Sequence, residues 1–530
     1  MGKTILSNKI YLYLTEFFAG MSVMAVELGA SRLLAPYFSS SQIVWTIIIG
    51  TIMIAMALGN IWGGRSADKN PDPARLYKRL LIAAVWIAAI PFAGKYIIVL
   101  VSGAMALTIS NGFLIAAALV SCLLIFVFPL FLLGTVTPSL VKYTVDSLDD
   151  SGRIVGTLGA FNTIGSIIGT FLPTFVTIPA VGTSVTFILF SGVLMVLGLV
   201  YFITEKRKAA LCIVTAVLYV AFSILGHGGG FAFWKNDLEY EGESVYNYLQ
   251  VNEDSESVRL STNVMFGVRS VMMKEDRLTG MYYDYALAAP LMSDAGEDAE
   301  VLILGMGTGT YAKQLMRYYS PSGIEGVEID SKITALAREY FDLPEEIKVT
   351  TYDGRAYLQA VDKKYDVIMV DAYQDITIPF QMSSAEFFTL VKEHLNPGGV
   401  MVVNLNMNSK SEGSVSDYIS DTVDSVFKTV CSVRVPASTN AVLFASQSSD
   451  MLGNLNRRIS QIGDSQLAAF LGNAADKIVN YYGGDLILTD DKAPVELLGI
   501  KAIDDIITDE LDYYKEMFRK YGIFGVLDRL

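Results

Sequence analysis

The stretch VLILGMGTGTYAKQL, residues 301–315, decides the fold of the second half of this chain. It begins as a short apolar run typical of a buried strand, continues through Gly305, Gly307 and Gly309, and ends in residues typical of a helix. A glycine loop between a strand and a helix lets backbone approach a ligand closely, as in many nucleoside sites. Three glycines alone are a weak signal, because many tight turns need them.

The runs that follow this loop strengthen the prediction. Short β-rich runs alternate with helical stretches, and two more runs lie close together near the end: VLILG, IEGVEID, IKVTTYDG, YDVIMVD and VMVVNLN, then CSVRVP and AVLFAS. Alternation of strand and helix predicts a parallel doubly wound sheet, and the close pair predicts an antiparallel end to it. The expected fold is an α/β Rossmann-like domain of the methyltransferase type.

Acidic residues end three successive predicted strands. Glu328 ends the second strand, where a carboxylate can accept both hydroxyl protons of a ribose. Asp353 ends the third strand, where it could accept the exocyclic amine of an adenine, and Asp371 ends the fourth at the centre of the sheet. Each acid alone is as readily explained as a helix cap. Three of them behind a glycine loop favour a ligand-binding edge.

The first half of the chain has the composition of a membrane protein. Hydrophobic residues make up 52% of the 530 residues, charged residues only 18%, and the apolar excess lies before about residue 226. A bundle of about seven transmembrane helices is therefore expected. We expect the first segment to span the membrane and not to be a removed signal peptide. The predicted segments are 10–34, 42–62, 80–101, 113–136, 154–178, 183–203 and 209–225.

The predicted chain therefore has three parts, which are a transmembrane helical bundle (1–228), a small β-rich segment with a lead-in helix (229–290) and the Rossmann domain (291–530). Gly165 and Gly169 predict close packing of the fifth helix against a neighbour. Charged residues within the bundle indicate either a polar pathway or structural pairs, and they are Glu16, Glu27, Arg32 and Lys95.

The charges of the loops predict how the bundle is oriented. The loops at 63–79 and 204–208 are rich in Lys and Arg, whereas those near 35–41, 102–112 and 179–182 carry none. The even-numbered loops should be cytoplasmic, so seven spans place the soluble half outside a multi-pass cell membrane protein. Nucleoside cofactors are made in the cytosol, which favours the other side. The side therefore stays open at this point.

Composition also argues against two classes of ligand. The formal net charge is −14, which is not the basic footprint of nucleic-acid binding. The three cysteines are scattered and only two histidines are present, so neither a disulfide framework nor a metal site is expected. The expected partners are a small molecule and the lipid bilayer, and a homo-oligomer stays an open option.

Several segments resemble the spermidine synthase (polyamine aminopropyltransferase) family. The similar segments of the core are VEIDSKITALAREYF, TTYDGRAYL, YDVIMVDAY and NPGGVMVVN, preceded by ESVYNYLQV and MYYDYALAAPL. IPFQMSSAEFF (378–388) and LTDDKAPVELL (488–498) are similar to a bacterial branch in which a membrane bundle precedes the synthase domain. The resemblance is good over 298–405 and weak in the bundle.

The resemblance implies a donor, an acceptor and a set of site residues. The donor would be decarboxylated S-adenosylmethionine and the acceptor a small amine. Glu328 would bind the ribose, Asp353 the adenine amine, and Asp371 would be catalytic. The implied cofactor-binding residues are Gly305, Gly307, Thr308, Gly309, Glu328, Asp353 and Gly354, and the implied amine-binding residues are Tyr282 and Asp375.

Three positions depart from the family pattern. Thr308 stands where the family's GGGDG loop has an aspartate that binds the aminopropyl amine. Gln374 stands where a second aspartate is expected, although Asp375 is adjacent, and Arg269 stands where glutamine is common. A site with fewer negative charges attracts a dication less and tolerates a carboxylate better. Intact S-adenosylmethionine is therefore a second candidate cofactor.

The sequence is compatible with three functions. The leading prediction is a membrane-bound aminopropyltransferase that extends a di- or polyamine. The second is a methyl- or aminocarboxypropyltransferase that uses intact S-adenosylmethionine. The third is an amine transporter with a nucleoside-sensing soluble domain, for which Glu27 and Arg32 are the supporting residues. The three strand-end acids favour catalysis over sensing.

Overall fold

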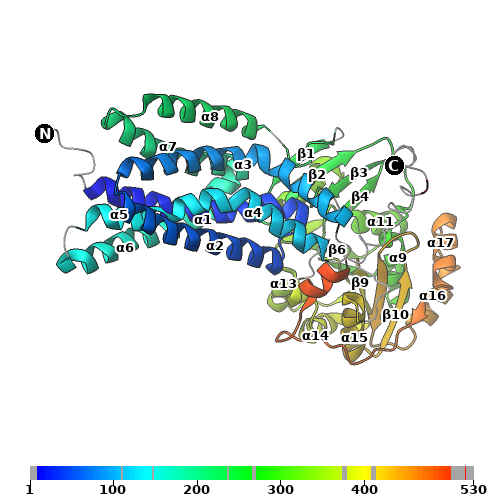
Figure 1. Ribbon diagram of the computed structural model, residues 1–530. Coiled ribbons are helices and arrows are strands. Elements are labelled where there is room, and N and C mark those ends of the chain that lie inside the picture. The colour runs from blue at the N-terminus through cyan, green and yellow to red at the C-terminus, as the bar shows by residue number, and fades with distance from the viewer. Residues whose placement is uncertain are drawn as a thin grey trace. The chain divides into compact units, whose positions relative to one another are not determined.

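The computed structural model divides the chain into two compact units, 1–234 and 235–530 (Figure 1). The structure describes residues 9–108, 112–145, 148–228, 230–235, 238–264, 270–372, 379–406, 413–502 and 520. Each unit is considered by itself. The division into three parts with boundaries at 228 and 290 stays a prediction.

The first unit consists of helices. Their bounds are α1 Lys9–Phe38, α2 Gln42–Lys69, α3 Pro73–Thr108, α4 Phe113–Gly134, α5 Val136–Thr144, α6 Leu148–Leu172, a π-helical turn η2 Pro173–Thr177, α7 Ile178–Thr204 and α8 Ala209–His227. Within the described residues, six helical stretches are long and apolar enough to cross a membrane. The fifth of these stretches, 151–204, contains both the fifth and the sixth predicted segments.

The chain reverses its direction inside this long stretch, at Gly182. Its backbone is not helical there (φ 80°, ψ 170°), and the Thr186 hydroxyl lies 3.0 Å from that of Thr177. Nine residues of straight helix would separate these positions by about 13.5 Å. Ser22 and Tyr11 of α1 contact the carbonyls of Phe190 and Leu197 in reversed order, so α7 runs antiparallel to α1.

Close approach of backbones joins α6 to α1. A Cβ at Gly165 would lie 2.0 Å from the Phe17 carbonyl oxygen, and one at Gly169 would lie 2.1 Å from that of Met21. Only glycine permits this distance between the two helices. The predicted packing role of Gly165 and Gly169 is confirmed, and the matching order of the contacts makes α6 parallel to α1.

Two charged side chains of the apolar helices form hydrogen bonds inside this unit. Glu16 is fully buried, and its Oε1 accepts from Thr137 Oγ1 at 2.5 Å and from Asn162 Nδ2 at 2.8 Å. Its Oε2 is buried and has no hydrogen-bond partner in the described part of the chain. Lys95 Nζ donates to the Gly230 carbonyl at 2.9 Å. Glu16 and Lys95 therefore face the interior of the unit, as expected for charged residues in apolar helices.

The second unit contains two sheets. The first has the order β1-β2-β3-β4 and is antiparallel, with β1 Leu238–Glu243, β2 Tyr248–Glu253, β3 Ser257–Ser261 and β4 Ser270–Met273. The second sheet has the order β12-β10-β11-β9-β8-β5-β6-β7. Its strands β9, β8, β5, β6 and β7 are parallel, and β11, β10 and β12 continue it with antiparallel pairs. The predicted parallel sheet with an antiparallel end is confirmed.

Helices alternate with the strands of the large sheet (Figure 1). The elements before and within its parallel part are α9 Tyr282–Ala286, α10 Ala288–Met292, η3 Gly296–Asp298, β5 Glu300–Leu304, α11 Thr310–Tyr318, β6 Gly323–Glu328, α12 Ser331–Tyr340, β7 Lys348–Thr351, α13 Gly354–Ala360, β8 Tyr365–Val370, η4 Phe380–Met382, α14 Ala385–Glu393 and β9 Leu395–Leu405. The remaining elements are α15 Val415–Val426, β10 Thr429–Arg434, β11 Ala441–Ser446, α16 Met451–Ile459, α17 Ser465–Ala475 and β12 Val479–Asn480. The strand order reverses between β5 and β8, and open α/β sheets bind ligands at such a point, beyond the carboxyl ends of the strands.

Candidate active site

The glycine loop lies directly against the end of β8. Gly305 follows β5 with φ +86°, and a Cβ there would lie 2.6 Å from the backbone of Ala372 and from the Asp371 carbonyl oxygen. Glycine is required both for this positive φ and for the space. The Asp371 N–H donates to the Leu304 carbonyl at 2.8 Å. The loop and Asp371 therefore meet at the carboxyl ends of β5 and β8.

Glu328 holds the loop in place from the end of β6. Its carboxylate is buried, and it accepts from the Gly307 N–H at 3.0 Å and from the Asp330 N–H at 3.1 Å. A carboxylate oxygen has two lone pairs, so each oxygen can still accept a further hydrogen bond. The binding of a ribose by Glu328 stays a prediction, and the structure adds a contact with the loop.

Asp353 is the N-cap of α13. Its Oδ1 accepts from the Ala356 N–H at 2.8 Å, and Gly354 is the first residue of the helix. A cap contributes about 1 kcal/mol to helix stability, so this contact alone would explain an aspartate here. Contact of Asp353 with an adenine amine stays a prediction.

A hydrogen-bonded chain fixes the side chain of Asp371. Its Oδ2 accepts from the Tyr282 hydroxyl at 2.6 Å and its Oδ1 from Asn404 Nδ2 at 2.9 Å. Asn404 Oδ1 in turn accepts from Asn440 Nδ2 at 2.8 Å. Tyr282 was singled out in the sequence, whereas Asn404 and Asn440 were not. The available signal for Asn404 was a polar residue within the apolar run VMVVNL that forms β9.

Burial keeps Tyr282, the tyrosine of this hydrogen-bonded chain, in its protonated form. Burial, followed by the nearby charge of Asp371, raises the pKa of Tyr282 well above its ordinary value. Burial and Asp371 also raise the pKa of the neighbouring Tyr283. The Tyr282 hydroxyl therefore stays protonated and donates a hydrogen bond to Asp371 over the whole physiological range of pH, which holds the carboxylate in one orientation.

Comparison with known proteins identifies the family. Residues 281–456 match the family described as "Spermine/spermidine synthase domain". The chain is 54% identical over 346 residues to a probable polyamine aminopropyl transferase of Bifidobacterium longum, covering 62% of this chain and 77% of that protein. The chain belongs to the polyamine aminopropyltransferase family. It is a transferase.

More distant relatives match about half of the chain. Identity to a polyamine aminopropyltransferase of Vibrio vulnificus is 29% over 263 residues, covering 47% of this chain and 84% of that one. Among solved structures, a probable spermidine synthase from Corynebacterium glutamicum matches with 22% identity and a TM-score of 0.36, over 44% of this chain and 93% of that chain.

Thr308, the loop residue for which the resemblance implies an aspartate, is 1% exposed in this aminopropyltransferase. Its backbone N–H donates to Ser270 Oγ at 3.2 Å, while its own hydroxyl has no hydrogen-bond partner in the described residues. The neutral side chain thus lies in a closed environment next to the glycine loop. Arg269, Gln374 and Asp375 lie outside the described residues.

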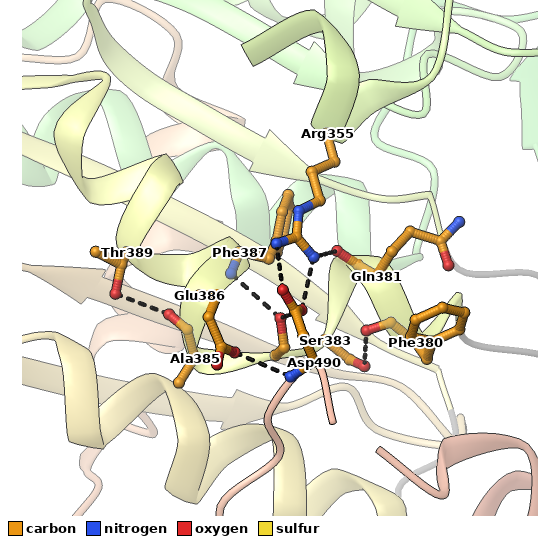
Figure 2. Close-up of polar contacts among 10 residues, drawn as sticks. Arg355, Phe380, Gln381, Ser383, Ala385, Glu386, Phe387, Thr389 and Asp490 are labelled. Atoms are coloured by element: carbon orange, nitrogen blue, oxygen red, sulfur yellow. Dashed lines mark hydrogen bonds and ion pairs between the residues drawn. The ribbon is translucent and has the colours of Figure 1, made fainter. Parts of the chain in front are cut away.

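A second cluster of polar residues lies beside α13 in the aminopropyltransferase (Figure 2). The Arg355 guanidinium donates to both carboxylate oxygens of Asp490, at 2.7 and 2.6 Å, and to the Gln381 carbonyl at 3.0 Å. Asp490 also accepts from Ser384 Oγ at 2.6 Å, and its N–H donates to Glu386 Oε2 at 3.0 Å. The resemblance gave IPFQMSSAEFF and LTDDKAPVELL no role, and the structure shows that the two segments meet here.

In the described part of the chain, no group of three or more His, Cys, Asp or Glu residues could hold a metal ion. The described residues of the candidate site are a glycine loop, strand-end carboxylates and a buried tyrosine.

Proposed function

We propose that the chain is a membrane-bound aminopropyltransferase that moves the aminopropyl group of decarboxylated S-adenosylmethionine to a di- or polyamine. The observation that carries the proposal is the Asp371 carboxylate, oriented by Tyr282 and Asn404 directly beside the glycine loop. A carboxylate in this position can attract an ammonium and remove its proton. Membership of the family supports the same reaction.

The chemistry requires alignment more than activation of the donor. The amine nitrogen attacks the aminopropyl carbon bonded to the sulfonium, the carbon–sulfur bond breaks, and methylthioadenosine leaves with the electron pair. The proton lost by the amine passes to Asp371. Because the sulfonium is already a good leaving group, positioning and proton removal provide the main catalytic effect. The Tyr282 hydroxyl keeps Asp371 in place during this transfer.

The arrangement around the loop suits the nucleoside of such a donor. Glu328 is proposed to accept the ribose hydroxyl protons and Asp353 the adenine amine, while the loop glycines provide the space beside them. Glu328 is buried at a strand end, with lone pairs left after its two backbone contacts. Asp353 retains a second carboxylate oxygen beyond the one that caps α13. Asp375 and Tyr282 are proposed to face the amine.

The apolar helices support a location in the membrane. We propose seven crossings, because the reversal at Gly182 divides the stretch 151–204 into two antiparallel helices. The charged loops at 63–79 and 204–208 then assign the cytoplasmic side to the even-numbered loops. The lipid bilayer is the corresponding partner, and a homo-oligomer is compatible with it.

One observation favours a second function, the use of intact S-adenosylmethionine for methyl or aminocarboxypropyl transfer. Thr308 is neutral where the family has an acid, so the loop repels a carboxylate less. One charge at about 4 Å near a partly buried site contributes about 4 kcal/mol before desolvation, which is enough to change a preference.

A single assay separates these functions. The purified full-length protein is incubated with either donor and a panel of di- and polyamines, and the products are identified by mass spectrometry. We expect methylthioadenosine and an amine longer by one aminopropyl group, only when decarboxylated donor and amine are both present. Formation of S-adenosylhomocysteine and a methylated product would contradict the proposal. So would the absence of methylthioadenosine with every amine.

A further inference from the structure

A cavity of about 170 Å³ lies beside the glycine loop, and its lining includes Thr308 of the loop and residues of α11. It is open to solvent on one side and is lined by β4, by the segment that follows β4 and by one face of α11. Asp371, Glu328 and Asp353 do not line it, whereas Thr308 does. The cavity therefore shares a wall with the proposed donor site but is built from other residues.

Two buried polar atoms on the walls of this cavity lack partners. Thr308 is 1% exposed and Gln314 is 7% exposed, and neither Thr308 Oγ1 nor Gln314 Oε1 has a hydrogen-bond partner in the described residues. Gln314 Nε2 donates to Asp284 Oδ1 at 2.6 Å. This hydrogen bond fixes the amide in one orientation, in which Gln314 Oε1 points away from Asp284 Oδ1. A buried acceptor without a donor is unfavourable, which indicates that a ligand or water supplies one.

The charges on the walls are not all paired. Arg317 is bonded to Asp276 at 2.7 Å and Arg277 to Glu256 at 2.6 Å. Lys313 Nζ contacts Met272 Sδ at 3.0 Å and the Phe341 carbonyl at 2.7 Å, but it forms no ion pair within the described residues.

Glu275, which also lines the cavity, is exposed. Burial lowers the pKa of the Lys313 ammonium, and the charges of Asp342 and Asp276 offset part of this effect. The walls thus offer an ammonium that forms no ion pair within the described residues and a fixed acceptor, Gln314 Oε1.

We propose that this cavity binds an α-amino-acid group, with its carboxylate on Lys313 and its ammonium on Gln314 Oε1 and Thr308 Oγ1. A diamine would leave Lys313 facing a like charge, and a simple anion would leave Gln314 Oε1 without a donor. A ligand that carries both charges on neighbouring atoms can satisfy Lys313 and Gln314 of α11 together.

This chemistry has two sources. One is a free amino acid such as methionine, which would act on the donor site through the shared Thr308. The other is the amino-acid end of intact S-adenosylmethionine, an end that the decarboxylated form has lost. The second source rests on the proposed nucleoside site, whereas the first does not. Binding from either source would fix the loop that carries Thr308.

Calorimetry on the full-length protein tests the proposal. The ligands are methionine, S-adenosylmethionine, its decarboxylated form and methylthioadenosine, and the variants are Lys313→Met and Lys332→Met. Lys332 lies on the neighbouring helix α12 and does not line the cavity, so it is the matched control. Lys313→Met should weaken carboxylated ligands by about tenfold to a hundredfold, the scale of one charge-assisted hydrogen bond.

Each outcome has a defined meaning. A loss of methionine binding that is specific to Lys313→Met supports the free amino acid. A loss for S-adenosylmethionine alone, with the decarboxylated form unchanged, supports the amino-acid end of the cofactor. Equal changes for both forms, or no binding of any carboxylated ligand, would overturn the proposal. Methylthioadenosine has no amino-acid group, so retained binding of it leaves the nucleoside site intact whichever result is found.

Discussion

Buried carboxylates are held in different ways in the two units. Glu328 accepts from backbone N–H groups of Gly307 and Asp330, which lie 21 and 2 residues away in the chain. Glu16 accepts only from side chains, Thr137 and Asn162, which lie 121 and 146 residues away. Strand ends and loops leave backbone donors free, whereas helices consume theirs. Backbone groups of the adjacent loop therefore position Glu328, whereas side chains of remote helices position Glu16.

The largest expected effect tests Asp371 as the group that removes the proton. Asp371→Asn keeps the shape and the hydrogen bond from Tyr282 but cannot accept a proton at neutral pH. Turnover should fall by about 10² or more, the usual scale for a general base, while methylthioadenosine binding stays unchanged. Steady-state kinetics and calorimetry measure the two quantities. Unchanged turnover would make Asp371 structural and direct attention to Asp375.

The second prediction concerns Glu328, whose carboxylate accepts hydrogen bonds from backbone N–H groups. Glu328→Ala removes charge-assisted hydrogen bonds of about 1.5–3 kcal/mol each, so methylthioadenosine should bind at least about tenfold more weakly. Calorimetry on the full-length variant measures the loss, and Asp371→Asn is the control that should retain binding. An affinity equal to that of the parent would show that the Glu328 carboxylate only supports the loop.

A third prediction concerns the helical unit, where the backbones of α6 and α1 are in close contact. Gly165→Ala forces a methyl group against the Phe17 carbonyl and should destabilise the helical unit by about 1–3 kcal/mol. Gly159→Ala on the same helix meets nothing within 4 Å and is the control. Thermal unfolding in detergent compares the two. Equal midpoints would mean that α6 can move away from α1 without loss.

The smallest effect is expected at Asp490. Hydrogen bonds from Arg355 lower the pKa of Asp490 below its ordinary value. Its contribution to stability is therefore complete above the unfolded pKa of about 3.9 and is lost as the pH falls through the lower folded-state value. Asp490→Asn should lower stability by about 1 kcal/mol at neutral pH, because this pair is partly exposed.

Thermal unfolding at neutral and strongly acidic pH measures this contribution, with exposed Asp491→Asn as the control. The difference between the parent and Asp490→Asn should vanish in acid. A difference that persists there would assign the effect to the shape of the segment and not to its charge.

Sequence reasoning succeeded where the chemistry is local. The glycine spacing and the acids at the ends of β6, β7 and β8 predicted the edge of the sheet at which the candidate site lies, because strand ends in an alternating fold fall on one side. The hydrogen bonds of Asn404 and Asn440 behind Asp371 were not predicted, because an asparagine on a buried strand gives no sign of its partner. The partners of Glu16 could not be predicted for the same reason, because side chains from distant helices supply them.

The ion pair between Arg355 and Asp490 also joins residues that are 135 positions apart. Synthesis proceeds from the N-terminus, so every strand of the parallel sheet has emerged long before Asp490 is available. The helix that Asp353 caps is fastened only after this late contact forms. A chain that stops before residue 488 would contain the whole parallel sheet and the loop yet lack this fastening, so such incomplete chains should form the sheet without a fully fixed donor pocket.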